Sequence, residues 1–206
     1  MTLHALVATL AAGSGSDAGP VQGSQAAVVA GVVAYLTAHD LPTVAELRAL
    51  APAPDVVLMT IADDARADGL CRARAVAALR LLPSLAVQDF LARLVQAKAK
   101  ASDATDRLLV RRAAVTLGWM AAPFASARLA LLFENDNADV RLDAVIGIGL
   151  TRSADAAAIL RKQLAVETVA RVRDQIDRQL RVLEPVPPEQ KDSHATPGRQ
   201  PMRSAF

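Results

Sequence analysis

The feature that most constrains the fold is a pair of helical patterns that recurs along the chain from Asp55 onward. In each pair the apolar residues fall on one side of a helix, as Phe90, Leu91, Leu94 and Val95 do. The first members are DVVLMTIADD, VQDFLARLVQAKA, SARLALLFEN and DAAAILRKQL, and the second members are CRARAVAALRLL, LVRRAAVTLGWM, VRLDAVIGIGL and VRDQIDRQLRVL. Two helices that repeat every 30–40 residues or so are typical of a solenoid.

The second helices share a pattern of residue types. An arginine comes first, a small residue follows, and a large aliphatic residue comes next, in the sets Arg72, Arg111, Arg141, Arg173; Ala75, Ala113 or Ala114, Ala144, Ile176; and Leu79, Leu117, Ile148, Leu180. The second repeat is ambiguous by one residue, because Arg111 and Ala113 cannot both be in register. Asp68, Asp106 and Asp136 precede these helices, where a carboxylate can accept free backbone N–H bonds. We therefore expect Arg72, Arg141 and Arg173 to have structural roles.

Composition favours an all-helical chain. Alanine makes up about a fifth of the 206 residues and aromatic residues only 3%, and the β-branched and aromatic residues that favour strands are not concentrated in short alternating runs. Alanine and arginine are abundant and lysine is rare, which is a composition typical of proteins from GC-rich bacterial genomes. The single cysteine, Cys71, excludes an intrachain disulfide, and we expect it to be a small core residue.

The runs DNADVRLDAVIGIGL and DRLLVRRAAVTLG resemble HEAT repeats, more narrowly the bacterial HEAT-like type of the phycobilisome lyases. The resemblance covers roughly residues 54–183, about four repeats, with residues 24–51 as an atypical N-terminal helical cap. It implies an armadillo-like α-solenoid of about four antiparallel helix pairs. The fourth repeat departs from the pattern at Ile176 and Gln179, which suits a terminal repeat with one neighbour. A third function, that of a lyase-type enzyme with a cofactor, is implied only by the name of the subfamily.

Three regions are expected along the chain. Residues 1–23 contain an apolar stretch, Leu3 to Ala12, with the length of a signal-peptide core, followed by a Gly- and Ser-rich linker. Residues 24–183 form the HEAT-like solenoid, and residues 184–206 are a Pro-rich tail without enough apolar residues to fold. We expect export to the periplasm or secretion, with a cytoplasmic location as the alternative. No apolar run reaches the ~20 residues of a transmembrane helix.

Enzyme motifs are weak throughout. Gly13, Gly15 and Gly19 have the wrong spacing for a dinucleotide loop, and no strand–helix alternation follows them. The histidines, His4, His39 and His194, are far apart and form no metal-ligand pair. No serine lies in a nucleophile elbow. We therefore expect a protein without catalytic activity, cofactor or metal.

The charge of the chain is unevenly distributed. Residues 1–68 carry a net charge of −5 (two basic, seven acidic), and residues 69–128 carry +7 (ten basic, three acidic). This basic zone leaves a second interpretation open, in which the partner is anionic, either nucleic acid or an acidic protein. The HEAT-like DNA glycosylases have a similar architecture, but this chain lacks the cluster of aromatic residues that would hold a base.

Our main functional hypothesis is a scaffold that binds a protein partner through the inner, concave face of the solenoid. The second helices line that face, and their outward positions are the candidate partner-binding residues Arg74, Arg111, Arg112, Val115, Trp119, Leu142, Ile146 and Arg178. Arginine, tryptophan and aliphatic residues are the types favoured at protein interfaces. For Trp119, which lies in the run GWMAAP, we favour a structural role, which is to fill the junction between two repeats. The partner and the oligomeric state cannot be read from the sequence.

Overall fold

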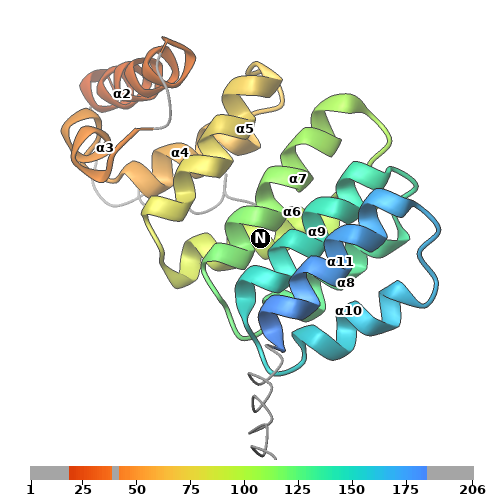
Figure 1. The fold of residues 1–206 in the computed structure, drawn as a ribbon. Coiled ribbons are helices and arrows are strands. Elements are labelled where there is room, and N and C mark those ends of the chain that lie inside the picture. Colours follow the sequence, from red (N-terminus) through yellow and green to blue (C-terminus); the bar gives the residue numbers. More distant parts are fainter. Residues whose placement is uncertain (1–18, 39–41, 185–206) are drawn as a thin grey trace, which may run out of the picture.

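The computed structural model describes residues 19–38 and 42–184, and every regular secondary-structure element in this part of the chain is a helix (Figure 1). The prediction of an all-α fold is confirmed. In these two ranges, no helix is both long and apolar enough to cross a membrane. The histidines, the apolar stretch Leu3 to Ala12 and the Pro-rich tail after Glu184 lie outside the described residues.

Four pairs of helices follow two N-terminal helices. The N-terminal helices are α2 (Gly19–Ala38) and α3 (Val44–Leu50), and the pairs are α4 (Pro54–Asp63) with α5 (Gly69–Ala78), α6 (Leu85–Ala97) with α7 (Ala104–Trp119), α8 (Ala125–Ala130) with α9 (Ala138–Thr151), and α10 (Ala156–Leu164) with α11 (Ala170–Leu183). Short 3-10 turns, η1 (Leu79–Leu81) and η2 (Leu131–Glu134), extend α5 and α8. All eight predicted helices of the recurring pairs are present.

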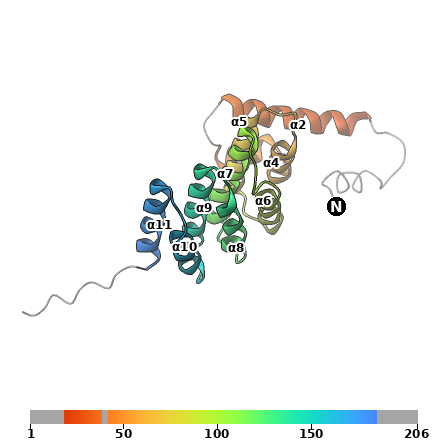
Figure 2. The same cartoon turned by 90° about the vertical axis from the view of Figure 1, so that its right-hand side faces the viewer.

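The pairs stack into two layers. Helices α5, α7, α9 and α11 lie side by side in one layer, and α4, α6, α8 and α10 lie behind them, as the two views show (Figures 1 and 2). Each helix of the first layer contacts the next one along the chain, and each also packs on its own partner in the second layer. Helix α2 packs on α3, α4 and α5 at one end of the stack.

Side chains at the helix starts explain where the first-layer helices begin. The Asp68 carboxylate accepts hydrogen bonds from the backbone N–H groups of Leu70 and Cys71, at the start of α5. Asp103 caps α7 and Asn137 caps α9 in the same way. The caps of α7 and α9 are therefore not Asp106 and Asp136, although both lie within three residues of the cap.

The contact between α7 and α9 depends on small residues. Gly118, Gly147 and Ala114 bring the two backbones together, since a Cβ added at Gly147 would lie 2.5 Å from the carbonyl oxygen of Ala114. Beside them, Ala113 and Ala144 are fully buried. Only residues with a single carbon or none in the side chain permit such an approach.

The burial pattern settles the register of the second repeat. Leu109, Ala113 and Leu117 in α7 are buried like Val140, Ala144 and Ile148 in α9, each 31 residues later (109 to 140, 113 to 144, 117 to 148). Ala121 and Arg152, which follow the two helices, both have left-handed backbone conformations and are also separated by 31 residues. The alignment of Arg111 with Arg141 is therefore wrong, and Val110 occupies the corresponding position.

The sequence leaves this register ambiguous because α7 begins one turn earlier than α9. Asp103 starts α7, so three extra residues precede the part of the helix that matches α9. At the N-terminus, α2 begins at Gly19, so residues 19–23 are helical and not part of the linker that we expected. Pro20 suits the first turn of a helix, where its missing N–H has no intrahelical partner in any case.

Candidate interaction surface

Three of the repeating arginines bind backbone carbonyl groups inside their own helix pair. Arg72 donates from Nε to the carbonyl oxygen of Ala62, at 3.0 Å, near the end of α4. Arg141 donates to the carbonyl oxygens of Asn135 and Asp136, at 2.8 and 3.0 Å. Arg173 donates to those of Leu164 and Glu167, both at 2.8 Å. These arginines satisfy carbonyl groups that a helix end leaves without partners, as the sequence predicted for a structural role.

Arg141 also joins two helix pairs through Glu167. Nε and Nη2 of Arg141 bind the two carboxylate oxygens of Glu167, at 2.9 and 2.8 Å. The Glu167 side chain is 1% exposed and also accepts from Gln163 and from the Val169 backbone N–H. The bond from Arg141 is the main reason that the pKa of Glu167 is lowered to about 2. This pair holds the α10–α11 loop against the start of α9.

The outward residues of the first layer form one continuous surface, here called the front surface. On α7 and α9 it consists of residues at equivalent positions: Leu108, Arg111, Arg112, Val115 and Trp119 on α7, and Asp139, Leu142, Asp143, Ile146 and Leu150 on α9. At the positions equivalent to those of α9, α5 contributes Leu70, Arg74 and Ala77, η1 contributes Leu81, and α11 contributes Arg171, Asp174, Gln175, Arg178 and Val182. All eight predicted candidate residues belong to this surface.

One half of the front surface is held by ion pairs. Nε of Arg111 lies 2.6 Å from Oδ2 of Asp143, and Nη1 of Arg111 lies 3.7 Å from Asp139. Asp139 also pairs with Arg171 on α11, so a chain of charges links three helices. The pKa of Asp143 is raised because desolvation outweighs the favourable effects of Arg111 and Arg112. Arg111 is thus engaged within the fold.

The other half of the front surface is apolar. Leu81, Trp119, Leu150 and Val182 occupy equivalent positions on the four neighbouring helices, and we call them the apolar row. Trp119 is 59% exposed and Val182 is 61% exposed. Trp119 therefore does not fill the junction between repeats, and the role favoured for it from the sequence is wrong. Val115 and Ile146, both half-buried, lie one turn before Trp119 and Leu150.

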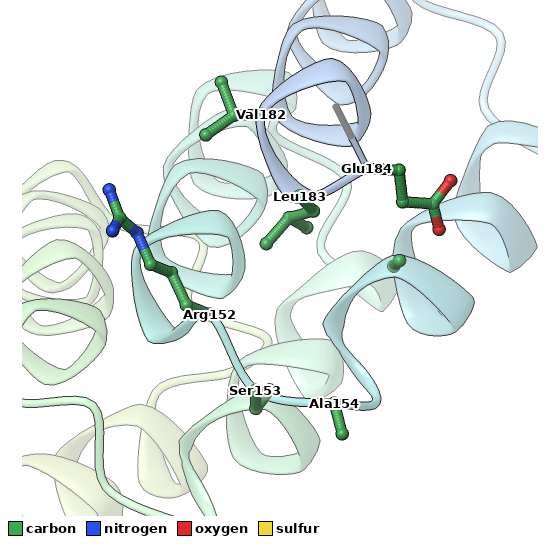
Figure 3. Close-up of a pocket in the computed structure, with 7 residues that line it drawn as sticks. Arg152, Ser153, Ala154, Val182, Leu183 and Glu184 are labelled. Carbon is green, nitrogen blue, oxygen red and sulfur yellow. The ribbon is translucent and has the colours of Figure 1, made fainter. Parts of the chain in front are cut away.

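A hollow of about 430 Å³ adjoins the end of the apolar row. Its lining combines the loop after α9, the start of α10 and the end of α11: Arg152, Ser153, Ala154, Ala157, Val182, Leu183 and Glu184. Figure 3 shows Arg152 and Glu184 on opposite sides, with Leu183 between them. Val182 belongs to both the row and the hollow, and the rest of the lining combines the charged Arg152 and Glu184 with small and apolar residues.

The candidate residues differ in how free their side chains are. Arg74 donates to the carbonyl oxygens of Leu36 and Thr37, so it joins α5 to the C-terminal end of α2. Leu142 and Ile146 are half-buried. Arg112 and Arg178 are exposed, and Arg178 bonds only to Gln175 on its own helix among the contacts described. Arg112, Trp119 and Arg178 are therefore the most accessible candidates.

Sequence reasoning missed Leu81, Leu150 and Val182. The repeat spacing could have indicated them, because each lies one repeat away from Trp119 or from its equivalent. Leu150 follows Trp119 by 31 residues, and Val182 follows Leu150 by 32. The one-residue ambiguity at Arg111 obscured that count. With the ambiguity removed, the same sequence yields the whole row.

Several basic residues of the zone at residues 69–128 bind acidic side chains or carbonyl groups within the fold. Arg72 and Arg74 bind carbonyl groups, Lys98 pairs with Asp106, Lys100 with Glu134, and Arg111 with Asp143. The other basic residues lie on four elements: Arg80 in η1, Arg93 on α6, Arg107 and Arg112 on α7, and Arg128 on α8. This distribution differs from the single basic stripe that marks a nucleic-acid interface.

Reactive groups are few in the described part of the chain. Cys71 is buried, and desolvation is the main reason that the pKa of its thiol is raised, so it is a poor nucleophile. Within residues 19–38 and 42–184, no three His, Cys, Asp or Glu side chains are grouped so that they could hold a metal ion. Ser126, Thr151 and Ser153 bond to one another through their hydroxyl groups, and no histidine or carboxylate among the described contacts activates them.

Comparison of the chain with family models, with curated proteins and with solved structures found no match.

Proposed function

We propose that this chain is a HEAT-like α-solenoid that binds a protein partner, without catalysis, through its front surface. Four consecutive helix pairs in two layers, with three structural arginines at equivalent positions, support the solenoid interpretation. In this proposal α2 and α3 form the N-terminal cap.

The observation that carries the proposed function is the apolar row. In this row Trp119 and Val182 are exposed, with half-buried Leu150 between them, and an apolar area of this kind on several helices is a feature of surfaces that bind a partner. Tryptophan and arginine contribute most to binding at protein interfaces, and here Arg112 and Trp119 lie two turns apart on α7. The ion pairs of Arg111, Asp139, Asp143 and Arg171 hold the neighbouring helices in place, so the row is presented on a fixed support.

An anionic partner has weaker support. Five of the basic residues in the 69–128 zone already bind acids or carbonyl groups of the fold, so the zone has less free charge than its composition indicates. A protein with acidic residues opposite Arg112 and Arg178 remains compatible with the front surface, and we include it within the main proposal.

The proposal is tested by placing a photo-crosslinking amino acid at position 182 in the full chain, in native cells, and identifying the partner by mass spectrometry. The partner is then purified and its affinity measured. Trp119→Ala and Val182→Asp should each weaken binding by about tenfold or more, which corresponds to about 1.4 kcal/mol. The unfolding midpoint should stay within a few degrees of wild type, because both side chains are more than half exposed.

The matched control is Val166→Asp. Val166 is 69% exposed and precedes α11, whereas Val182 lies near the other end of that helix. The control should leave the affinity unchanged. Equal loss in Val182→Asp and Val166→Asp, or no loss in Trp119→Ala, would show that the partner binds elsewhere.

A further inference from the structure

Five exposed arginines border the apolar row, and the set consists of Arg80, Arg112, Arg152, Arg178 and Arg181. Arg112 and Arg178 lie toward the starts of α7 and α11, whereas Arg152 follows the end of α9. Figure 3 shows Arg152 on the same side of Leu183 as Val182. Within the described residues, the only side-chain hydrogen bond or ion pair of these five is the one from Arg178 to Gln175. Most of the positive charge beside the row is therefore available to a partner.

The acidic side chains near the apolar row are either paired or lie off the front surface. Glu184 forms an ion pair with Arg161 of α10. Asp177 occupies the position in α11 that buried Val145 occupies in α9, so it lies on the side of α11 where a further helix would pack. The surroundings of the row thus carry a net positive charge. A partner with acidic side chains on both sides of the row would match this charge.

A second line of apolar residues lies beside the apolar row. One turn earlier on α5, α7 and α9, Ala77, Val115 and Ile146 occupy equivalent positions and are half-buried. Neither line contains a side chain that can accept a hydrogen bond. An extended peptide on this area would bury backbone N–H groups without an acceptor, which is unfavourable. A helix bonds its backbone groups internally, so it can cover the area with side chains alone.

The spacing of the apolar row fits one side of a helix. Packed helices are about 8–10 Å apart, so Trp119, Leu150 and Val182 follow one another at about that interval. Residues seven positions apart in a helix lie on the same side, about 10.5 Å apart along the axis. A helix that crosses the row at a slight angle therefore places one apolar residue over each of the three. Such a helix needs roughly 15 residues.

We propose, on the basis of the proposed function, that the front surface binds an amphipathic helix of the partner with apolar residues at seven-residue intervals and acidic residues on both sides of them. The helix crosses α7, α9 and α11, and its apolar side covers the row. Its acidic residues face Arg112 and Arg178 on one side and Arg152 on the other. Burial of Trp119 contributes most to the affinity, and the arginines fix the orientation of the helix.

Binding of a designed peptide to the full chain tests this proposal. The probe is a helical peptide of about 18 residues, made of alanine, leucine and glutamate. Its leucines are at positions i, i+4, i+7, i+11 and i+14, with glutamates on both sides of them. One control peptide has lysine in place of each glutamate, and another has the probe's composition in scrambled order. The probe should bind about ten times more tightly than either control, and added salt should weaken its binding.

The fluorescence of Trp119 locates the peptide. Trp119 is the only tryptophan of the chain and is 59% exposed, and the probe contains none. Its emission should therefore shift to shorter wavelength as the leucines of the probe cover the row. The control peptides should leave the emission unchanged at the same concentration.

Charge reversal tests the two sides of the row separately. Arg112→Glu and Arg152→Glu should each weaken binding of the acidic probe about three- to tenfold and strengthen binding of the lysine peptide. Arg93→Glu is the matched control, because Arg93 is an exposed arginine on α6, in the other layer. It should leave both affinities unchanged. Equal effects of the three substitutions would overturn the proposal, since they would reflect the net charge of the protein alone.

Other outcomes would also contradict the acidic helix. Equal affinity for the probe and the lysine peptide, or an unchanged Trp119 emission, would overturn it. Binding to phosphatidylglycerol vesicles without binding of the probe would assign the surface to a membrane. A protein that crosslinks to position 182 through an extended or lysine-rich segment would overturn this proposal and leave the proposed function intact. The absence of any crosslink at position 182 would instead overturn the proposed function.

Discussion

Gly118 of α7 and Gly147 of α9 face each other so closely that the two helices touch through their backbones. A Cβ added at Gly118 would lie 2.3 Å from the carbonyl oxygen of Gly147 and 2.6 Å from its Cα. Both of these neighbours are backbone atoms, which cannot move aside as a side chain can. The middle of the stack therefore depends on the absence of two side chains.

Gly118→Ala should lower the free energy of unfolding by about 1–3 kcal/mol, because the added methyl group pushes α7 away from α9. Gly31→Ala is the matched control, since nothing lies within 4 Å of its Cβ. That change should raise the stability by about 0.5–1 kcal/mol, because alanine is the better helix former. Urea unfolding measures both. Equal effects of the two substitutions would contradict the close contact.

Ala121→Gly should stabilise the protein. Ala121 follows the end of α7 with φ of 48°, a left-handed conformation that costs a residue with a Cβ about 1 kcal/mol. We expect a gain of about 0.5–1 kcal/mol in the free energy of unfolding. Ala158→Gly, at an exposed position within α10, should instead lose about 1 kcal/mol. A loss at both positions would mean that residue 121 is not left-handed in solution.

Glu167→Gln should remove a pH-dependent contribution to stability. The pKa of Glu167 is about 2 in the folded chain against an ordinary value of 4.5, so its contribution is complete above about pH 4.5. It is lost as the pH falls through about 2. A shift of this size corresponds to roughly 3 kcal/mol. Denaturant unfolding between pH 2 and pH 7 should show this decline in wild type but not in Glu167→Gln.

The control for this measurement is Glu134→Gln. Glu134 pairs with Lys100 at 3.1 Å, but both side chains are largely exposed, so the substitution should change stability by less than about 1 kcal/mol. A similar loss in the two variants would indicate that burial does not strengthen the Arg141–Glu167 pair.

Arg111→Met should destabilise the chain by about 1–3 kcal/mol, because it leaves the Asp143 carboxylate half-buried without its closest cation. The pKa of Asp143 is already raised, so protonation relieves this penalty, and the loss should shrink as the pH falls through that pKa. Arg112→Met, one residue along and exposed, should change stability by less than about 0.5 kcal/mol. Equal and small effects would show that Arg111 is as free as Arg112.

Much of the helical framework could be predicted from the sequence. Apolar spacing located every helix of the four pairs, and the small residues at 113 and 144 indicated where α7 and α9 meet. The register of the second repeat could not be derived, because Asp103 and Asp106 are both good helix caps. Only packing decides that α7 starts at the earlier one.

The front surface was predicted in part. Arg112 and Arg178 are exposed as expected, and Trp119 is exposed although a place in the junction between repeats was favoured for it. Arg74 and Arg111 are instead engaged with α2 and α9. An arginine on the outward side of a helix has the same sequence signature whether its partner is another helix or another protein. Its actual partner depends on which acids and carbonyl groups neighbouring helices bring within reach, and this is a property of the tertiary structure.

The glycine contact also has a mechanical consequence. Where α7 and α9 meet through backbone atoms, no side chain can change its rotamer, so this junction should be the stiffest in the stack. The next junction is softer, because the flexible side chain of Gln179 fills the space beside Gly149. When a partner pulls on the front surface, we expect α11 to tilt against α9, while α7 and α9 move as one body. The distance between Val182 and Leu150 would then change when the partner binds, whereas the distance between Leu150 and Trp119 would stay the same.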